Sequence, residues 1–460
     1  MSKERKVLHR VLANAGTLLG GRTVNALVGL SYIALTARGL GRELMGVIVL
    51  INAFSQFLGD VARFQSWQTL LQYGAGFLLQ GDRPRFQQVL RFTLLLDIIG
   101  AIVGVTLGVC GALLLGSHFG WPANLSPAAA AYALSIAVME SATSVGLLRL
   151  FDRFRFLAAE QAVSSAVRLV GCALAFLSHA PIEAYLLAWA AGTLAAFVYV
   201  NGVALWDLNR RELLRGFTIR GPLSEGLPNI WRFAWATNFS GTIDTAFTQV
   251  ITLVVGAVLG PAQAAMWRVG RQVADGMAKP AKLLVPALYP ELAKMRATGG
   301  EAAMRKLSRQ IGLIGGGVAG VLLLISILFG GPLLGLVMGK SFAAGAGIMN
   351  WQVAAAAIGV LAMPLEPMLV SLGRAGSALK VRALVCLAYL AVLVPLIHAA
   401  GLNGAGAALV GVSAALAIGM YLTLRHALAA ESTLAPTHAP ARANDEQTCA
   451  DHENGAKGVS

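Results

Sequence analysis

The chain has 460 residues, of which 57% are hydrophobic and 13% are charged, with a mean hydropathy of +0.68 and a formal net charge of +14. A soluble domain carries about 25% charged residues, so this composition excludes a soluble globular protein and predicts a polytopic membrane protein. The four cysteines are scattered and form no CxxC pair, so a disulfide framework is not expected.

Long apolar stretches in the first part of the chain predict six membrane-spanning helices. Basic residues gather at the N-terminus (Lys3, Arg5, Lys6) and in the connections 63–88 and 149–156, which the positive-inside rule places in the cytoplasm. The helices are predicted at 11–37, 44–62, 89–116, 125–147, 157–178 and 182–205.

The second part of the chain repeats this pattern and predicts six more helices. A basic stretch at 207–232 precedes them and is predicted to be a cytoplasmic linker between two lobes, 1–206 and 233–428. An even number of spans places both termini in the cytoplasm, and residues 429–460 form a polar tail that is expected to be disordered. The helices are predicted at 233–259, 262–282, 309–337, 345–372, 380–399 and 403–426.

The distribution of charge and motifs argues against several functions. Most Lys and Arg residues lie in alternate connections, so the basic excess indicates membrane orientation and contact with anionic lipids, and we expect no nucleic-acid partner. The outer connections are short and carry few polar groups, and no HExxH or GxSxG motif occurs. We therefore expect no enzyme, no metal site and no bound cofactor.

The chain reads as two copies of one six-helix unit, offset by about 219 residues. Under this offset Asn25 matches Asp244, and Asp60 matches Lys279. Because each copy begins in the cytoplasm, the repeat is parallel, which is typical of transporters built from two helical bundles around a central cavity. With a slightly different offset, Gly100, Gly104 and Gly108 match Gly312, Gly316 and Gly320 as ladders that permit close helix packing.

Polar side chains inside the predicted spans point to the walls of that cavity. The stretch "MWRVGRQVADGMAKP" (266–280) places Arg268, Arg271 and Asp275 on one helix face, and Arg22 and Asn25 share a face of the first helix. An ionisable group at bilayer depth costs roughly 2.5–3.5 kcal/mol on insertion scales, so it is retained where it faces water, a partner or a substrate. Charges near helix ends could instead snorkel or pair with each other.

Arginine suits a ligand that carries phosphate, because its planar fork binds phosphate bidentately and stays charged. We therefore assign Arg22, Asn25, Arg268 and Arg271 to substrate binding in the cavity. Candidates for coupling to H⁺ or Na⁺, or for gating, are Asp244, Asp275 and Glu366. Glu366 lies between two prolines in "AMPLEPML" (362–369), which predicts a broken helix there; a simple kink is the alternative.

Several stretches resemble one family. "FQSWQTLLQYGAGFLLQGD" (64–82), "GLLRLFDRFRFLAAEQAV" (146–163), "LGPAQAAMWRVGRQVADGMAKPAKLLVPALYPELAKM" (259–295) and "VSLGRAGSALKVRALV" (370–385) are similar to Wzx-type oligosaccharide flippases of the multidrug/oligosaccharidyl-lipid/polysaccharide (MOP) exporter superfamily. The resemblance implies an all-α, MATE-like fold of twelve helices in two lobes in the bacterial inner membrane. It also implies a substrate, an undecaprenyl-diphosphate-linked oligosaccharide such as an O-antigen, capsule or exopolysaccharide repeat unit, moved by alternating access.

The cavity arginines cannot be transferred from the family position by position, so their assignment depends on the residues of this chain. The resemblance implies lipid-linked glycan, membrane lipids, a glycan polymerase and glycosyltransferases as partners. Three alternatives stay open: a cation-coupled multidrug or organic-cation exporter of the same superfamily, a glycosyltransferase or polymerase, and a non-transporting scaffold of a glycan-assembly complex. An organic-cation cavity should be acidic and aromatic, which the arginines near residue 270 disfavour.

Overall fold

A computed structural model describes residues 3–139, 141–282, 300–371 and 374–434, and all the regular secondary structure within these ranges is helical. Within these ranges the structure describes every side chain except those of residues 3–24, 239–248, 277–282, 300–315, 318–319, 367, 370–371, 375 and 428–434. The long helices are α1 (Lys3–Ala62), α4 (Arg83–Leu115), α7 (Phe154–Leu177), α8 (Ile182–Arg210), α9 (Ile230–Leu259), α10 (Pro261–Lys282), α12 (Gly300–Met338), α13 (Ala346–Ala362) and α15 (Ala375–Leu434).

Two of these helices each contain a sharp break at a glycine. Gly41 (φ 72°, ψ −176°) divides α1, and Gly401 (φ 57°, ψ −137°) divides α15, at the positions where the sequence predicts short outer turns. A positive φ is strained for most residues but not for glycine. Eight stretches of the described chain are long and apolar enough to cross a membrane, and two of them, Asn25–Leu79 and Gly376–Ala427, contain these breaks.

Two predicted helices are interrupted. The segment predicted at 125–147 consists of α5 (Ser126–Ala133), a 3₁₀ turn (Leu134–Val138) and α6 (Ala142–Leu150). The segment predicted at 345–372 consists of α13 and α14 (Leu365–Ser371), and the break falls at Met363–Pro364. The broken helix expected from "AMPLEPML" is therefore confirmed.

The connection predicted at 63–88 is mostly helical, which corrects its assignment as a loop. It contains α2 (Ser66–Thr69), a π-helical turn (Leu70–Gly74) and α3 (Ala75–Leu79). Leu70 and Phe86 are fully buried in a core that also includes Leu147. Apolar side chains thus pack this segment on α4 and α6. In the sequence these apolar residues are interspersed with polar and basic ones, so the helix is hard to recognise there.

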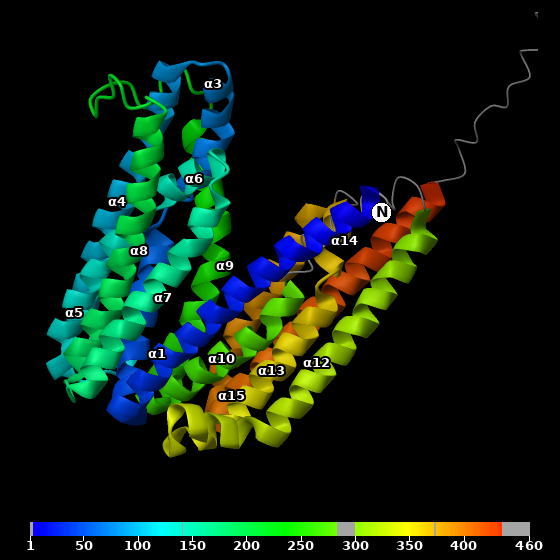
Figure 1. Cartoon of the computed structure of the whole chain (residues 1–460). Coiled ribbons are helices and arrows are strands. Elements are labelled where there is room, and N and C mark those ends of the chain that lie inside the picture. The colour runs from blue at the N-terminus through cyan, green and yellow to red at the C-terminus, as the bar shows by residue number, and fades with distance from the viewer. Residues whose placement is uncertain (1–2, 140, 283–299, 372–373, 435–460) are drawn as a thin grey trace, which may run out of the picture.

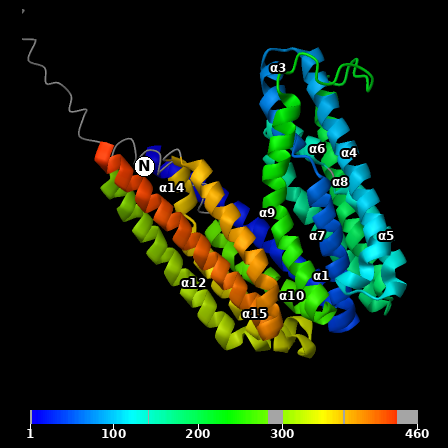
Figure 2. The same cartoon turned by 180° about the vertical axis from the view of Figure 1, so that it is seen from behind.

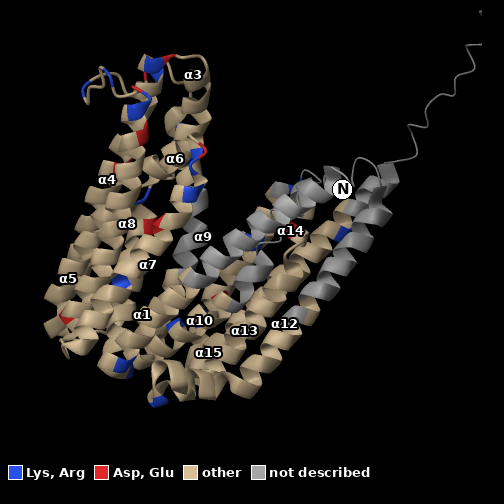
Figure 3. Cartoon of the chain, viewed as in Figure 1, with Lys and Arg blue, Asp and Glu red and all other residues tan. Residues whose placement is uncertain are grey.

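The helices form two bundles, shown from opposite sides in Figures 1 and 2. We call α1 beyond Gly41 together with α4–α8 the N-bundle, and α10–α15 the C-bundle. The bundles lie together at the end of the short turns and diverge toward the end that carries α3 and α14 (Figure 1). Lys and Arg residues gather at the diverging end of the N-bundle (Figure 3), so we call this end the basic end.

Helix α9 joins the two bundles. Its first turns pack on the N-bundle through three edge-on aromatic pairs: Phe64–Trp235, Tyr73–Phe233 and Phe92–Trp231. Its last turns pack on α10 and α15. Residues 233–235, predicted at the start of the second lobe, therefore lie against the first one.

The predicted linker is docked on the N-bundle. Gln87 donates to the carbonyl oxygens of Leu213 (2.7 Å) and Arg215 (2.9 Å), and Arg91 donates to those of Thr218 (2.7 Å) and Pro222 (2.9 Å). These bonds satisfy backbone groups of an irregular segment, which fixes its course. At the other end of the chain, α15 continues to Leu434, past residue 429 where the tail was predicted to begin, and residues 435–460 lie outside the described part.

The first predicted glycine ladder packs as expected. A Cβ atom at Gly100 would lie 2.7 Å from the carbonyl oxygen of Ala62, and one at Gly104 would lie 2.8 Å from Ile136. In the second ladder a Cβ at Gly316 would lie 2.8 Å from Leu361, but nothing lies within 4 Å of one at Gly320. The expected close packing is thus wrong at Gly320, which is exposed; Gly312 lies outside the described side chains.

We expect Gly104→Leu to destabilise the protein and Gly320→Leu to leave its stability unchanged. A larger side chain at Gly104 must displace Ile136 and the second half of α1, whereas Gly320 faces open space. Overpacking of this kind costs roughly 1–3 kcal/mol. Thermal unfolding of both variants in the same detergent measures the difference, and equal midpoints would contradict the assigned packing.

Candidate functional site

Helix α10 carries the charged stripe predicted from the sequence. Gly260 (φ 89°) ends α9, and Pro261 opens α10, where a residue without an N–H is well tolerated. Among the long helices described, α10 is the most strongly amphipathic. Its polar face therefore needs polar surroundings rather than lipid.

Arg268 lies where helices of both bundles meet. It is half-buried and close enough to Tyr32 of α1 and Arg168 of α7 for electrostatic interaction with both. Within the described side chains no carboxylate lies within ion-pair distance of Arg268. Two guanidinium groups from different bundles thus stand near each other, which makes this region attractive to an anion.

Arg271 has a different environment from Arg268. Its Nε lies 3.2 Å from a carboxylate oxygen of Asp275, one helical turn further along α10. The pair lines a cavity of about 150 Å³ inside the C-bundle, together with Gln352 and Ser413. The predicted stripe therefore contains one arginine near the junction of the bundles and one that is compensated by an acid within the C-bundle.

The first-helix residues are described in part. Asn25 is half-buried, and its Oδ1 is buried without a hydrogen bond. One turn later Gly29 faces Gln272, so this face of α1 packs on α10, and the assignment of Asn25 to substrate binding stays a prediction. The side chains of Arg22 and Asp244 lie outside those that the structure describes.

Glu366 forms an ion pair. Its Oε2 lies 2.8 Å from Nη2 of Arg382, and both side chains are partly exposed (43% and 32%). The pair joins α14 to α15 directly after the break at Pro364. A coupling role for Glu366 stays a prediction, and any such role involves the loss or exchange of this arginine partner.

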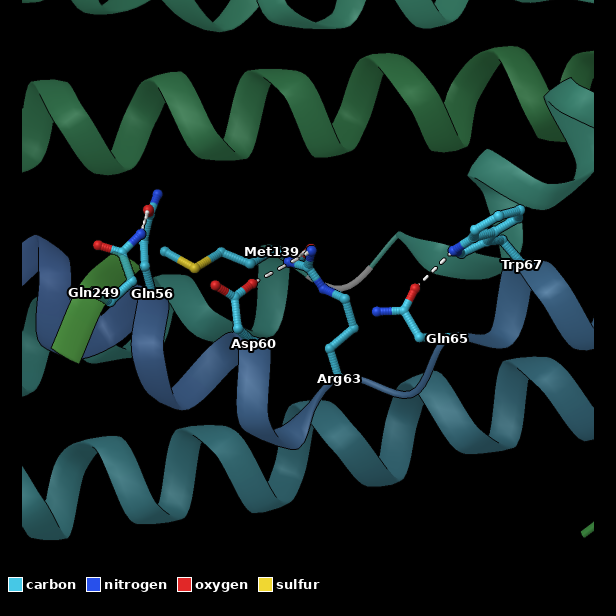
Figure 4. A network of polar contacts seen from close by, with 7 residues as sticks. All are labelled: Gln56, Asp60, Arg63, Gln65, Trp67, Met139 and Gln249. Carbon is cyan, nitrogen blue, oxygen red and sulfur yellow. Dashed lines mark hydrogen bonds and ion pairs between the residues drawn. The ribbon is translucent and has the colours of Figure 1, made fainter. Parts of the chain in front are cut away.

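A polar network lies where α1 ends (Figure 4). Gln249 of α9 donates to Gln56 (2.8 Å), Arg63 lies 3.8 Å from Asp60, and Nη2 of Arg63 donates to the carbonyl oxygen of Met139 (2.8 Å). Under the offset of 219 residues, Gln56 matches Asp275, Asp60 matches Lys279 and Arg63 matches Lys282 of α10. The residues that the internal repeat matches with α10 therefore form polar contacts on the part of α1 that follows the break at Gly41.

A second polar cavity lies inside the N-bundle, and sequence reasoning did not assign it. It has a volume of about 280 Å³, and we call it the N-bundle pocket. Its polar lining includes Gln56, Arg63, Glu160, Ser164, Arg168 and Thr193. Glu160, Ser164 and Arg168 recur every four residues along α7, a polar stripe that could have been read from the sequence.

At the converging end, backbone groups of the two bundles touch. A Cβ atom at Gly46 would overlap the backbone of Pro261, and Leu50 packs against Gly256. Arg38 donates from Nε to the carbonyl oxygen of Val337 (3.0 Å) and also bonds that of Leu336, in the last turn of α12. These carbonyls have no partner within the helix, and a cation there interacts favourably with the helix dipole.

We expect Arg38→Ala to favour conformations in which this end is separated. The lost cap is worth roughly 0.3–2 kcal/mol, which shifts the equilibrium about twofold to thirtyfold. Distance distributions between spin labels at Ser117 and Lys340 would report the change. Arg42→Ala, on the exposed side of the same turn, is the matched control, and identical distributions for both variants would contradict the capping role.

Comparisons with known proteins agree with this architecture. Residues 11–296 match the family model described as "Polysaccharide biosynthesis protein". The chain belongs to this family. The match confirms the resemblance seen in the sequence. It covers the N-bundle, α9 and α10, including the polar face of α10.

Individual relatives point the same way. The chain is 29% identical over 335 residues to "Inner membrane protein YghQ" of Escherichia coli (strain K12), covering 72% of this chain and 93% of that one. An inward-facing MATE family transporter of the MOP superfamily superposes with a TM-score of 0.72 at 14% identity, over 89% of this chain and 96% of that one. The lipid II flippase MurJ, in an inward closed conformation, gives 0.64 at 12% identity, over 89% and 87%.

At these identities the superpositions show the fold, which is the MATE-like fold predicted from the sequence. Family and fold together identify a polytopic membrane protein of a polysaccharide biosynthesis family with a MATE-like fold. The superpositions on the MATE and MurJ structures each cover 89% of this chain, so the likeness in fold extends over both bundles.

Proposed function

We propose that this member of the family is a flippase that moves an undecaprenyl-diphosphate-linked oligosaccharide across the bacterial inner membrane. The membership in a polysaccharide biosynthesis family supports a glycan substrate. A solved relative of the same fold is a lipid II flippase, and a sequence relative is an inner membrane protein. The positive-inside rule then places the basic end and both termini in the cytoplasm.

One observation carries the proposal: the bundles diverge at the basic end and meet at the other, and Arg268 stands at their junction with no carboxylate within ion-pair distance among the described side chains. A headgroup with two phosphates and several sugars cannot cross about 30 Å of hydrocarbon unaided. Arg268, together with Arg22 and Arg271, would neutralise the diphosphate, while the polyprenyl tail stays in the lipid. The diverging end is the side from which such a headgroup would enter.

Translocation would follow from alternating access. The bundles would close at the basic end and separate at the short turns, which requires the contacts of Arg38 and Gly46 to break. Coupling to H⁺ or Na⁺ is proposed for Asp244, Asp275 or Glu366, because a carboxylate can exchange its arginine partner for a cation as the bundles move. A glycan polymerase and glycosyltransferases would act on the same lipid before and after transport.

The proposal is tested with the purified full chain in liposomes. Undecaprenyl diphosphate carrying a fluorescent sugar is placed in both leaflets, and a membrane-impermeant quencher reports how much becomes accessible outside with time. We expect quenching of both leaflets with the protein and of one leaflet in empty liposomes. Equal quenching with and without the protein would overturn the flippase and favour a scaffold. Efflux of an organic cation without movement of the lipid would favour an exporter.

A further inference from the structure

The lining of the N-bundle pocket is polar and suits a polar ligand. It lies between the second half of α1, α7 and α8, and its volume of about 280 Å³ is close to the lower end of the range for small-molecule sites, roughly 300–1,000 Å³. Amides (Gln56, Gln161), hydroxyls (Ser164, Thr193) and one carboxylate (Glu160) line it. These groups can donate and accept hydrogen bonds, as the hydroxyls of a sugar do.

Arg168 is the unusual group of this pocket. Its Nη2 donates to Oγ1 of Thr193 (2.9 Å), and its Nη1 lies 3.5 Å from the hydroxyl of Tyr32. Its Nε is buried without a hydrogen bond. Within the described side chains no carboxylate lies within ion-pair distance of Arg168, so its hydrogen-bond partners are neutral, and the nearby guanidinium of Arg268 is also positive.

Glycine at position 192 of α8 leaves the space that the side chain of Arg168 occupies. A Cβ atom at residue 192 would overlap Cγ of Arg168 and lie 2.9 Å from its Nε, so only glycine fits there. The guanidinium carbon lies 5.6 Å from the ring centre of Trp189 and 5.8 Å from that of Tyr32. Aromatic faces hold the cation in place without neutralising it.

The acids in and beside the pocket interact with Arg63 rather than with Arg168. Glu160 interacts electrostatically with Arg63, which also lies 3.8 Å from Asp60. The positive charge of Arg168 is the one left without an acid inside the pocket. An incoming carboxylate therefore competes for Arg168 only with the neutral hydroxyls of Thr193 and Tyr32, and not with an internal acid.

We propose that the N-bundle pocket is a sugar subsite of the substrate headgroup, in which Arg168 pairs with the carboxylate of an acidic sugar. This inference rests on the proposed function. The amides and hydroxyls on α1, α7 and α8 bind the ring hydroxyls, and the aromatic pair Tyr32–Trp189 orients Arg168 toward the acid. The pocket thus distinguishes glycans, whereas Arg268 binds the diphosphate that all of them share.

The test measures binding of three lipids to the full-length protein in nanodiscs: undecaprenyl diphosphate, its conjugate with one neutral hexose, and its conjugate with one hexuronic acid. The wild type should bind the hexuronic acid conjugate about tenfold more tightly than the hexose conjugate, because a charge-assisted pair is added. Arg168→Gln should remove this preference and leave the affinity for undecaprenyl diphosphate unchanged. Arg155→Gln, an exposed arginine at the start of the same helix, should change nothing.

A milder variant keeps the test informative if Arg168→Gln fails to fold. Ser164→Ala removes a pocket hydroxyl without changing charge, and it should weaken both sugar conjugates but not undecaprenyl diphosphate. Equal binding of the hexose and hexuronic acid conjugates by the wild type would overturn the acidic-sugar assignment. An equal loss for all three lipids in Arg168→Gln would make Arg168 a phosphate ligand and overturn the subsite. No binding of any lipid would overturn the proposed function itself.

Discussion

Replacing Arg268 and Arg271 together by alanine should lower the rate of lipid-linked glycan translocation about a hundredfold. Each guanidinium can contribute charge-assisted hydrogen bonds to phosphate worth roughly 1.5–3 kcal/mol, and every 1.4 kcal/mol corresponds to a factor of about ten. Arg268 should account for most of the loss, because it is the member of the pair without an acid partner among the described side chains. The liposome quenching assay measures the rate directly.

The single variants separate the two roles. Arg268→Ala should lower both translocation and the affinity for undecaprenyl diphosphate, and Arg268→Lys should restore part of each, since lysine keeps the charge but lacks the fork. Arg271→Ala leaves Asp275 in the C-bundle cavity without this partner, so its effect should depend on pH and on the cation gradient.

Two exposed arginines at the basic end provide the control for the Arg268 and Arg271 variants. The double variant Arg220→Ala and Arg232→Ala removes two exposed positive charges at the basic end and should transport at the normal rate. Full translocation by the Arg268→Ala, Arg271→Ala variant, with normal thermal unfolding, would remove the diphosphate assignment. It would leave the fold and the family unaffected.

The sequence predicted the fold well because membrane helices are determined by local composition. Long apolar stretches and the glycines at positions 41, 260 and 401 gave the spans and their turns within a few residues. The helical segment 66–79 was missed because its buried side chains are interspersed with polar ones, and its burial depends on contacts with α4 and α6. Such contacts between distant segments leave little trace in one sequence.

The candidate site was predicted less completely. Residues on α10 were found because their charges stand out, yet whether Arg268 or Arg271 has an acid partner depends on helix rotation. No role is assigned to Arg168 from the sequence, because one sequence cannot show that its neighbours in space are Tyr32, Thr193 and Gly192. Arg168 is a candidate for ligand binding because the structure shows that its hydrogen-bond partners are neutral.

The strongest structural effect is expected for Asp207, at the end of α8. Its side chain is 1% exposed, and its two oxygens accept hydrogen bonds from Nε (2.7 Å) and Nη2 (2.9 Å) of Arg153, in the turn before α7. These bonds raise the pKa of Arg153 further above its ordinary value, so the arginine stays charged. The pair ties the turn between α6 and α7 to the basic end of α8.

We expect Asp207→Ala to lower the free energy of unfolding by about 1–3 kcal/mol, the range for leaving a hydrogen-bonding group without its partner, and by less than for a fully buried ion pair because water reaches Arg153. The loss arises because Arg153, 24% exposed, is left partly buried without its counter-charge. Replacing both residues with apolar ones, as in Arg153→Met with Asp207→Leu, should cost less than Asp207→Ala alone, because Arg153 is no longer left without its counter-charge, and Arg211, whose Nε lies 3.9 Å from Asp207, is 42% exposed and stays hydrated. Denaturant unfolding in a fixed detergent gives all three values.

An exposed ion pair nearby provides the matched control. Arg215 and Glu212 also approach to 2.9 Å, but their side chains are 72% and 51% exposed. Glu212→Ala should therefore change the unfolding free energy by no more than about 1 kcal/mol, since water replaces the lost partner. If Asp207→Ala and Glu212→Ala had equal effects, burial would not set the strength of the Arg153–Asp207 contact, and the turn between α6 and α7 would have to be held by packing on Phe151 instead.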